Sequence, residues 1–219
     1  MTPEPQPGPA PQAAIGHVYL IEDEAAVRRS LALLLQLHGY TTSEYASAED
    51  FLHGPPAPGA PACALVDIRL PGMSGLALQA RMVREERAPP VLLMTAQADA
   101  TVARTALLQG ASDFLEKPID PAELFPAVEA ALRADAAQRL ARAADEQLLA
   151  RFASLTRRER ALFDGITSGR QVREMAEQFG LANAELEAHR ARLMEKLQAR
   201  RLADLFRLRF RMDDRRTTR

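Results

Sequence analysis

Several residue types are scarce in this chain of 219 residues. It contains one cysteine, no tryptophan and two lysines, and aromatic residues make up 5% of the total. A single cysteine cannot form an intramolecular disulfide, so a disulfide scaffold is excluded and a reducing, cytoplasmic location is expected. No apolar run approaches the ~20 residues that a membrane-spanning helix requires. Residues 1–14 lack the basic start and apolar centre of a signal peptide and are expected to form a disordered tail.

Charge is distributed unevenly along the chain. Residues 1–150 hold 11 Lys and Arg against 19 Asp and Glu, a net charge of −8, whereas residues 151–219 hold 17 against 10, a net charge of +7. Such a division indicates an acidic module followed by a basic one. The basic module has the electrostatic character expected of a nucleic-acid-binding domain.

Short apolar runs alternate with helical patterns in the acidic module. Alternation of this kind predicts an α/β fold with a doubly wound, parallel, five-stranded sheet. Helices are expected over residues 25–38, 74–87 and 101–108, with a short one capped by Ser47 and another that begins at Pro121 behind the cap Asp120. The expected strands lie at residues 18–21, 41–45, 62–67, 90–94 and 112–116.

Polar residues stand where four of these strands end. Because the carboxyl ends of parallel strands meet at one edge of a sheet, they are expected to gather there. Acidic residues bind a hard divalent cation, and a lysine and a hydroxyl neutralise charge on a transferred phosphoryl group. Taken alone, Asp67 also fits an ordinary turn-capping role. The residues concerned are Glu22 and Asp23, then Asp67, Thr95 and Lys117.

The two lysines, Lys117 and Lys196, stand out in a chain that otherwise uses arginine. An ammonium group is a compact point charge that a guanidinium does not replace. Lysine at position 117 therefore indicates that a compact ammonium group is required there. The alternative is that a scarce residue stands at this position by chance.

Over residues 15–132 these motifs resemble those of the receiver domain of two-component response regulators, which has a flavodoxin-like fold. The motifs are the acidic pair, Asp67-x-x-x-Pro71-Gly72, Thr95 and Lys117-Pro118; the first acid is Glu22 where the family usually has Asp. The resemblance implies that Asp67 accepts a phosphoryl group from a sensor histidine kinase. It also implies that Mg²⁺ is bound by Asp23, Asp67 and the backbone carbonyl of Arg69, with Glu22 acting through water. Thr95 and Lys117 would hold the phosphoryl oxygens, and Thr95 and Phe114 would form the conformational switch.

The helix that begins at Pro121 has no clear end before about residue 149, so a long helical linker is expected. Leu140, Ala144 and Leu148 form a narrow stripe along it. The stripe fits either a partner helix or a solvated spacer.

The basic module predicts short helices with a helix-turn-helix arrangement. A capping box of Thr156 and Glu159 opens the first helix, and the others are expected over residues 172–179, 185–197 and 202–210. Over residues 154–212 the module resembles a LuxR/FixJ-type DNA-binding domain, which places the chain in the FixJ/NarL class. Ala182 replaces the usual capping Ser, and Asn183 is a possible substitute. The expected segments are a tail at 1–14, a receiver at 15–132, a linker at 133–153, a DNA-binding domain at 154–212 and a basic tail at 213–219.

Few basic side chains lie on the outward face of the expected recognition helix, residues 185–197. His189, beside apolar positions, is expected to be structural. Affinity is therefore expected to come mainly from phosphate contacts, with few base contacts. The residues expected to meet DNA are Arg173, Glu187, Ala188, Arg190 and Arg192.

Three functions are compatible with this sequence. The first is a transcription regulator whose phosphorylation promotes dimerisation and binding to double-stranded DNA. The second is a receiver whose basic domain acts through protein–protein contacts, which the altered start of the recognition helix favours. The third, an aspartyl-phosphate phosphatase of the haloacid dehalogenase type, needs a second acid where this chain has Arg69, so no enzyme activity of that type is expected.

Overall fold

The computed structural model describes residues 15–54, 60–85, 88–96 and 110–217. The expected tail at 1–14 and the expected helix at 101–108 lie outside these ranges. The chain divides into two compact units, Met1–Leu140 and Ala141–Arg219. The division falls inside one continuous helix, and each unit is described separately below.

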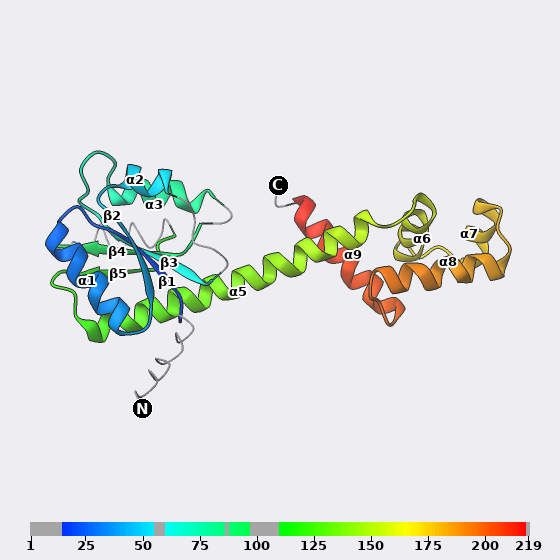
Figure 1. Ribbon diagram of the computed structural model, residues 1–219. Coiled ribbons are helices and arrows are strands. Elements are labelled where there is room, and N and C mark those ends of the chain that lie inside the picture. The colour runs from blue at the N-terminus through cyan, green and yellow to red at the C-terminus, as the bar shows by residue number, and fades with distance from the viewer. Residues whose placement is uncertain (1–14, 55–59, 86–87, 97–109, 218–219) are drawn as a thin grey trace, which may run out of the picture. The chain divides into compact units, whose positions relative to one another are not determined.

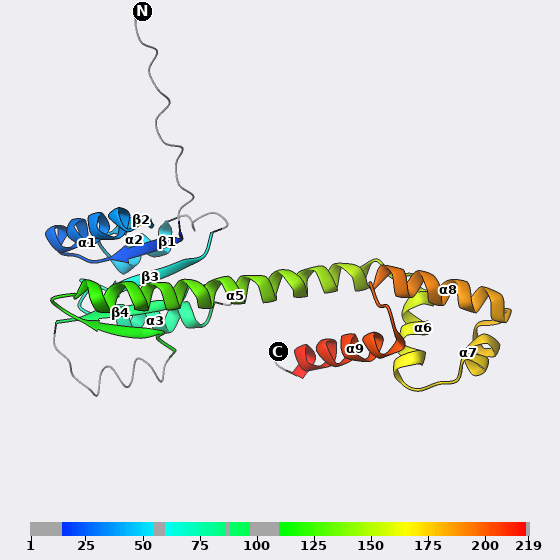
Figure 2. The ribbon, with the colours of Figure 1, turned by 90° about the horizontal axis from the view of Figure 1, so that it is seen from below.

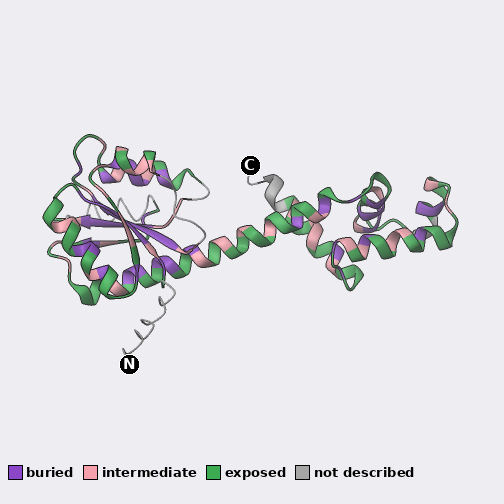
Figure 3. Cartoon of the chain, in the orientation of Figure 1, coloured by how far each residue is buried: buried purple, intermediate pink, exposed green. Residues whose placement is uncertain are grey.

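The first unit is built on a five-stranded sheet in which all neighbouring strands are parallel (Figure 1). The strand order is β2-β1-β3-β4-β5, which confirms the predicted fold class. All six residues of β3 are buried, which explains why this strand is a continuous apolar run (Figure 3). The strands are β1 (His17–Ile21), β2 (Thr41–Tyr45), β3 (Ala62–Asp67), β4 (Val91–Thr95) and β5 (Asp113–Glu116).

Helices cover both faces of the sheet. Helix α1 (Ala25–Leu37) and the first part of α5 (Pro121–Ala153) pack on one face, and α2 (Ala48–His53) and α3 (Gly75–Val83) on the other (Figures 1 and 2). Side-chain oxygens of Ser47 and Ser74 accept hydrogen bonds from backbone N–H groups and so cap α2 and α3. Helix α3 ends at Val83, four residues before its expected end, because a turn follows directly.

Helix α5 begins as predicted and continues through both units. The carboxylate of Asp120 accepts a hydrogen bond from the N–H of Ala122 at 2.8 Å, and the helix runs for 33 residues. Of the expected linker stripe, Leu140 is 73% exposed, whereas Leu148 is buried in the core of the second unit. The stripe is therefore not one continuous apolar face, because Leu140 is exposed whereas Leu148 belongs to a core.

The second unit consists of helices packed around a core of its own. Thr156 and Glu159 form the predicted capping box at the start of α6. Helix α9 extends past the expected end at residue 210 and takes in most of the expected basic tail. The helices are α6 (Arg157–Thr167), α7 (Val172–Phe179), α8 (Asn183–Lys196) and α9 (Leu202–Thr217), together with the last turns of α5.

The recognition helix, α8, begins two residues earlier than expected, at Asn183. Ala182 occupies the capping position and has no side-chain acceptor. The carboxylate of Glu185 instead accepts a hydrogen bond from the N–H of Ala182 at 3.0 Å. The expectation that Asn183 replaces the missing cap was therefore wrong, because Asn183 is already the first residue of the helix and Glu185 satisfies the terminal N–H.

Candidate functional sites

Asp67 lies at the carboxyl end of the central strand β3, beside the residues that follow β1. Glu22 and Asp67 are buried, with 1% and 6% of their surfaces exposed, whereas Asp23 is exposed. One carboxylate oxygen from each of these three acids lies within 4.8 Å of the others. Carboxylate oxygens at this spacing suit a hard divalent cation such as Mg²⁺. The structure thus brings together the three carboxylates that were expected to bind metal.

Lys117, immediately after β5, connects two of these acids. Its Nζ donates hydrogen bonds to Oε2 of Glu22 at 2.6 Å and to Oδ2 of Asp67 at 2.5 Å. Burial alone would lower the pKa of Lys117, but the bonds to Asp67 and Glu22 outweigh it and raise that pKa. The ammonium therefore stays charged and holds Asp67 next to the acidic cluster.

Glu22 is the most deeply buried member of the cluster. Burial raises its pKa, the bond from Lys117 opposes this, and the negative charge of Asp67 adds to it. A second positive charge therefore lowers the cost of keeping both carboxylates ionised. This is the electrostatic condition in which a divalent cation binds favourably.

Backbone groups fix the orientation of Asp67. The N–H of Arg69 donates to Oδ1 of Asp67 at 2.9 Å, so with Lys117 on Oδ2 each oxygen of this carboxylate has a donor. The following loop passes so close that a Cβ on Gly75 would lie 2.1 Å from the backbone oxygen of Asp67. Only glycine allows this approach. The backbone carbonyl of Arg69, expected as a metal ligand, belongs to this same tightly held turn.

The two expected switch residues lie on neighbouring strands. Thr95 ends β4 and Phe114 lies in β5, which pairs with β4 in parallel. Phe114 is half-buried and packs against the core on the α2–α3 face of the sheet. Thr95 lies at the same edge of the sheet as Asp67, whereas Phe114 pairs with Leu93, two residues before Thr95 on its strand. The switch role of the two residues stays a prediction.

Two residues that the sequence patterns did not indicate also support the site. Arg28 donates from its guanidinium to the backbone carbonyls of Glu22 and Asp23. Glu49 in α2 accepts a hydrogen bond from the N–H of Met73, in the loop that follows β3, at 2.9 Å. Both side chains bond to backbone atoms outside their own helices, so no local sequence pattern predicts these contacts.

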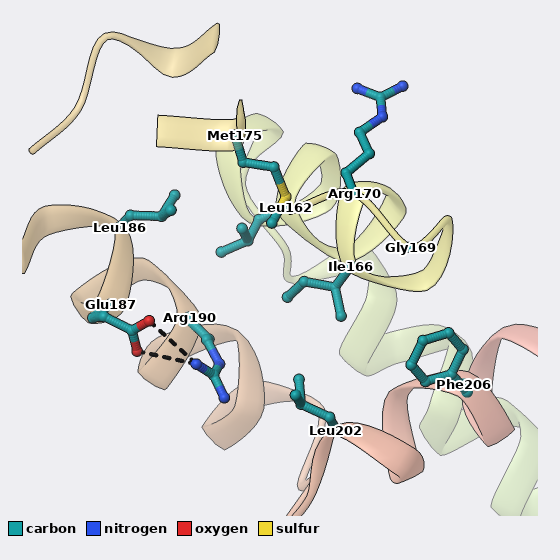
Figure 4. Close-up of a pocket in the computed structure, with 10 residues that line it drawn as sticks. All are labelled: Leu162, Ile166, Gly169, Arg170, Met175, Leu186, Glu187, Arg190, Leu202 and Phe206. Atoms are coloured by element: carbon teal, nitrogen blue, oxygen red, sulfur yellow. Dashed lines mark hydrogen bonds and ion pairs between the residues drawn. The ribbon is translucent and has the colours of Figure 1, made fainter. Parts of the chain in front are cut away.

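The second unit presents α8 as its candidate DNA-binding helix. Glu187, Ala188 and Arg192 are exposed, as expected for residues that meet DNA, and His189 is partly buried. Arg190 is engaged within the helix, because its guanidinium donates to both carboxylate oxygens of Glu187 at 3.2 Å (Figure 4). Arg173 belongs to α7, and its side chain lies outside the described part of the chain.

A largely apolar cavity of about 180 Å³ separates part of α8 from α9 (Figure 4). The Glu187–Arg190 pair lies at its edge on the α8 side. The core residue Leu193 of the same helix does not line this cavity and is fully buried. The cavity is lined by Leu162, Ile166, Gly169, Arg170, Met175, Leu186, Glu187, Arg190, Leu202 and Phe206.

The second lysine holds α8 to the start of α6. Nζ of Lys196 donates to Oε2 of Glu159 at 2.7 Å and to the carbonyl of Ser154 at 3.2 Å. Glu159 is only 2% exposed. Both lysines of this chain therefore bind a buried carboxylate and one further acceptor, which favours a specific requirement over chance placement.

Known protein families match both units of the chain. Residues 18–129 match the response regulator receiver domain, and residues 153–208 match the bacterial regulatory proteins of the luxR family. The transcriptional regulatory protein FixJ of Bradyrhizobium diazoefficiens is 35% identical over 193 residues, which cover 88% of this chain and 94% of that protein. The C4-dicarboxylate transport regulator DctR of Rhodobacter capsulatus is 38% identical over 198 residues, covering 87% of this chain and 98% of that protein.

Solved structures of two response regulators are similar to this chain over most of its length. The response regulator StyR superposes with a TM-score of 0.79 at 32% identity, covering 89% of this chain and 98% of that one. Full-length FixJ from B. japonicum gives a TM-score of 0.54 at 34% identity, covering 91% and 98%.

Fold, acidic site and helix-turn-helix unit together define a receiver protein with a DNA-binding module. The chain belongs to the FixJ-like response regulators, which join a receiver to a LuxR-type domain and regulate transcription. The match of the basic module to the luxR family favours DNA binding over the protein-interaction alternative. Within the described ranges, no helix has the length and apolar character needed to cross a membrane.

Proposed function

We propose that Asp67 is the phosphoacceptor of this response regulator and that its phosphorylation controls dimerisation and DNA binding. The observation that carries the proposal is the bridge from Lys117 to Glu22 and Asp67 inside a cluster of three carboxylates. A buried acceptor with a cation-binding cluster and a lysine beside it has the parts that phosphoryl transfer to a carboxylate requires.

In the proposed reaction, an oxygen of Asp67 attacks the phosphorus of a phosphohistidine on a sensor kinase. The P–N bond breaks, and an acyl-phosphate O–P bond forms at Asp67. Asp23, Asp67 and the backbone carbonyl of Arg69 are the proposed Mg²⁺ ligands, with Glu22 acting through water, and the ion would supply positive charge to the phosphoryl oxygens. Lys117 and Thr95 then hold those oxygens, so Lys117 exchanges a carboxylate partner for a phosphoryl partner.

The chemical step is tested by incubating the full chain with acetyl phosphate and Mg²⁺ and measuring the mass of the intact protein. We expect one phosphoryl group on the wild type, none on Asp67→Asn, and slower uptake on Asp23→Ala, which removes a proposed metal ligand. Asp50→Asn is the matched control, because Asp50 is an exposed aspartate in the same unit. Uptake by Asp67→Asn equal to that of the wild type would show that the acceptor lies elsewhere.

Regulation is tested with the phosphoryl mimic beryllofluoride. We expect the mimic to convert the protein to a dimer in size-exclusion chromatography with light scattering, and to raise its affinity for duplex DNA. Binding should fall steeply with salt, with a slope near −0.9 for each phosphate contact on a log–log plot. A beryllofluoride-loaded protein that binds no duplex at low salt would contradict the transcription-control proposal and favour the protein-interaction alternative.

A further inference from the structure

Asp135 in α5 is a buried carboxylate that the proposed phosphorylation site does not use. It is 1% exposed and lies within the first unit, beyond the expected end of the receiver at residue 132. Its side chain continues the face of α5 that packs on the sheet, because Leu124, Val128 and Ala131 precede it at helical spacing and are buried. An apolar residue is the usual occupant of such a position.

The carboxylate binds the beginning of the strand that carries Asp67. Oδ2 of Asp135 accepts a hydrogen bond from the backbone N–H of Ala62, the first residue of β3, at 2.8 Å. The next N–H on the same side of the strand, that of Ala64, bonds to the carbonyl of Pro90 before β4 begins. Asp135 thus supplies the acceptor that the sheet does not supply at the strand's first residue.

Arg139, one helical turn further on, completes the arrangement. Its Nε donates to the same carboxylate oxygen of Asp135 at 2.5 Å, and its side chain is 35% exposed. The pair therefore spans the border between the sheet-packed part of α5 and the part beyond it. Next to it, Leu132 fills the space over Gly16, where an added Cβ would lie 2.7 Å from a Leu132 methyl carbon.

A buried carboxylate with a partly exposed arginine as its partner is a poor choice for stability alone. Its desolvation cost is large, and well-packed apolar residues in its place are often neutral or stabilising. The hydrogen bond of the carboxylate is directional, because it can form with the N–H of Ala62 in only one register of α5 on the sheet. An apolar contact would tolerate sliding and rotation of α5.

We propose that Asp135 is a positioning residue that fixes the register of α5 against β3, so that the linker helix responds as one rigid element when the site at Asp67 changes state. The strand joins the two points: Ala62 is held by Asp135, and Asp67, five residues along and so ~16 Å away, is held by Lys117. The inference rests on the proposed function, because it concerns how phosphorylation of Asp67 reaches the DNA-binding unit.

The test compares three substitutions in the full-length protein. Asp135→Leu replaces the carboxylate by an apolar side chain that keeps the face buried. Asp135→Asn keeps a carbonyl oxygen for the N–H of Ala62 but removes the charge that meets Arg139. Glu129→Ala is the matched control, because Glu129 and Arg133 form an exposed ion pair of the same i, i+4 spacing on the same helix.

Three quantities are measured: phosphorylation by acetyl phosphate, DNA affinity with and without beryllofluoride, and hydrogen exchange of α5. We expect Asp135→Leu to fold and take up phosphate like the wild type while losing amide protection at Ala62 and over residues 136–147. The gain in DNA affinity on activation, about 5- to 150-fold in typical coupled systems, should fall to about onefold. Asp135→Asn should retain an intermediate gain, and Glu129→Ala the full gain.

The outcomes separate the inference from the function on which it rests. A wild type that gains no DNA affinity on activation contradicts the proposed function itself. A wild type and an Asp135→Leu variant with the same gain and the same exchange of α5 overturn the role of Asp135. Loss of phosphate uptake by both Asp135 variants overturns it too, because Asp135 would then serve the fold of the receiver rather than its connection to the linker.

Discussion

Replacing Lys196 by Met is predicted to destabilise the second unit markedly. The ammonium of Lys196 is the partner of Glu159, whose side chain is only 3% exposed, and it also binds the carbonyl of Ser154. Methionine has nearly the same length and keeps the apolar contacts of the lysine stem. The substitution therefore removes the charge and its hydrogen bonds while leaving the packing nearly intact.

The expected loss of unfolding free energy depends on the hydrogen bonds that Glu159 keeps in the variant. Removing one partner of a fully buried ion pair costs about 3–5 kcal/mol. Here the cost is smaller, because the Lys196 side chain is 35% exposed and the carboxylate of Glu159 still accepts from the N–H of Thr156 at 2.8 Å. A lost hydrogen bond to a charged group is worth about 1.5–3 kcal/mol, and we expect about 2 kcal/mol. For a unit of this size that lowers the melting temperature by about 8–16 °C.

The assay is thermal unfolding of the full chain, with hydrogen exchange of peptides from residues 155–200 assigning the transition to the second unit. The double substitution with Glu159→Gln measures the coupling between the two side chains. Arg209→Met is the control, because the pairs of Arg209 with Asp164 and Asp213 are exposed and should each contribute less than about 1 kcal/mol. A melting temperature unchanged by Lys196→Met, together with no coupling to Glu159, would refute this reasoning.

Three further predictions follow from the geometry. Hydrogen bonds from Lys196 and Thr156 overcome the effect of burial and hold the pKa of Glu159 below its usual 4.5. The stabilising contribution of Glu159 is therefore present above pH 4.5 and is lost as pH falls through the lowered pKa. In urea unfolding from pH 6 to pH 3, the free energies of unfolding of the wild type and Glu159→Gln should converge at the acidic end. Gly75→Ala forces a Cβ onto the backbone and should cost about 3 kcal/mol of stability in urea unfolding, with phosphate uptake reduced as well. Glu187→Ala frees the guanidinium of Arg190 and should steepen the slope of log affinity for DNA against log salt concentration by about 0.9. Arg192→Ala should weaken binding to all sequences alike and reduce that slope by about 0.9. Identical slopes in both variants would contradict these roles.

Strands and caps were predictable because their signals are local. The run that ends on Asp67 is apolar since both faces of β3 are covered, and Ser47 and the Thr156–Glu159 box bond to N–H groups within three residues of themselves. The acidic site was predictable for a related reason. In a parallel sheet every strand ends at the same edge, so strand ends that are distant in sequence meet there.

Contacts that join distant elements through the backbone were not predictable. Nothing near Asp135 indicates that its backbone donor is the N–H of Ala62, 73 residues earlier. The support that Arg28 and Glu49 give to the site likewise depends on tertiary packing. At the recognition helix, the absence of a capping side chain at Ala182 was read correctly. Its compensation by Glu185 was not predicted, since Asn183 was the substitute expected there.

The way α5 completes the first unit determines where the chain can be divided. The family match to the receiver ends at residue 129, yet Ala131 and Leu132 are buried in the core shared with α1. Ending the chain at residue 129 would expose the surface that Leu132 covers, at a cost of about 1.5–3 kcal/mol for that side chain alone, and would leave the first N–H of β3 without its acceptor. A receiver intended to fold by itself must therefore keep the helix through Leu140, the last residue of its compact unit.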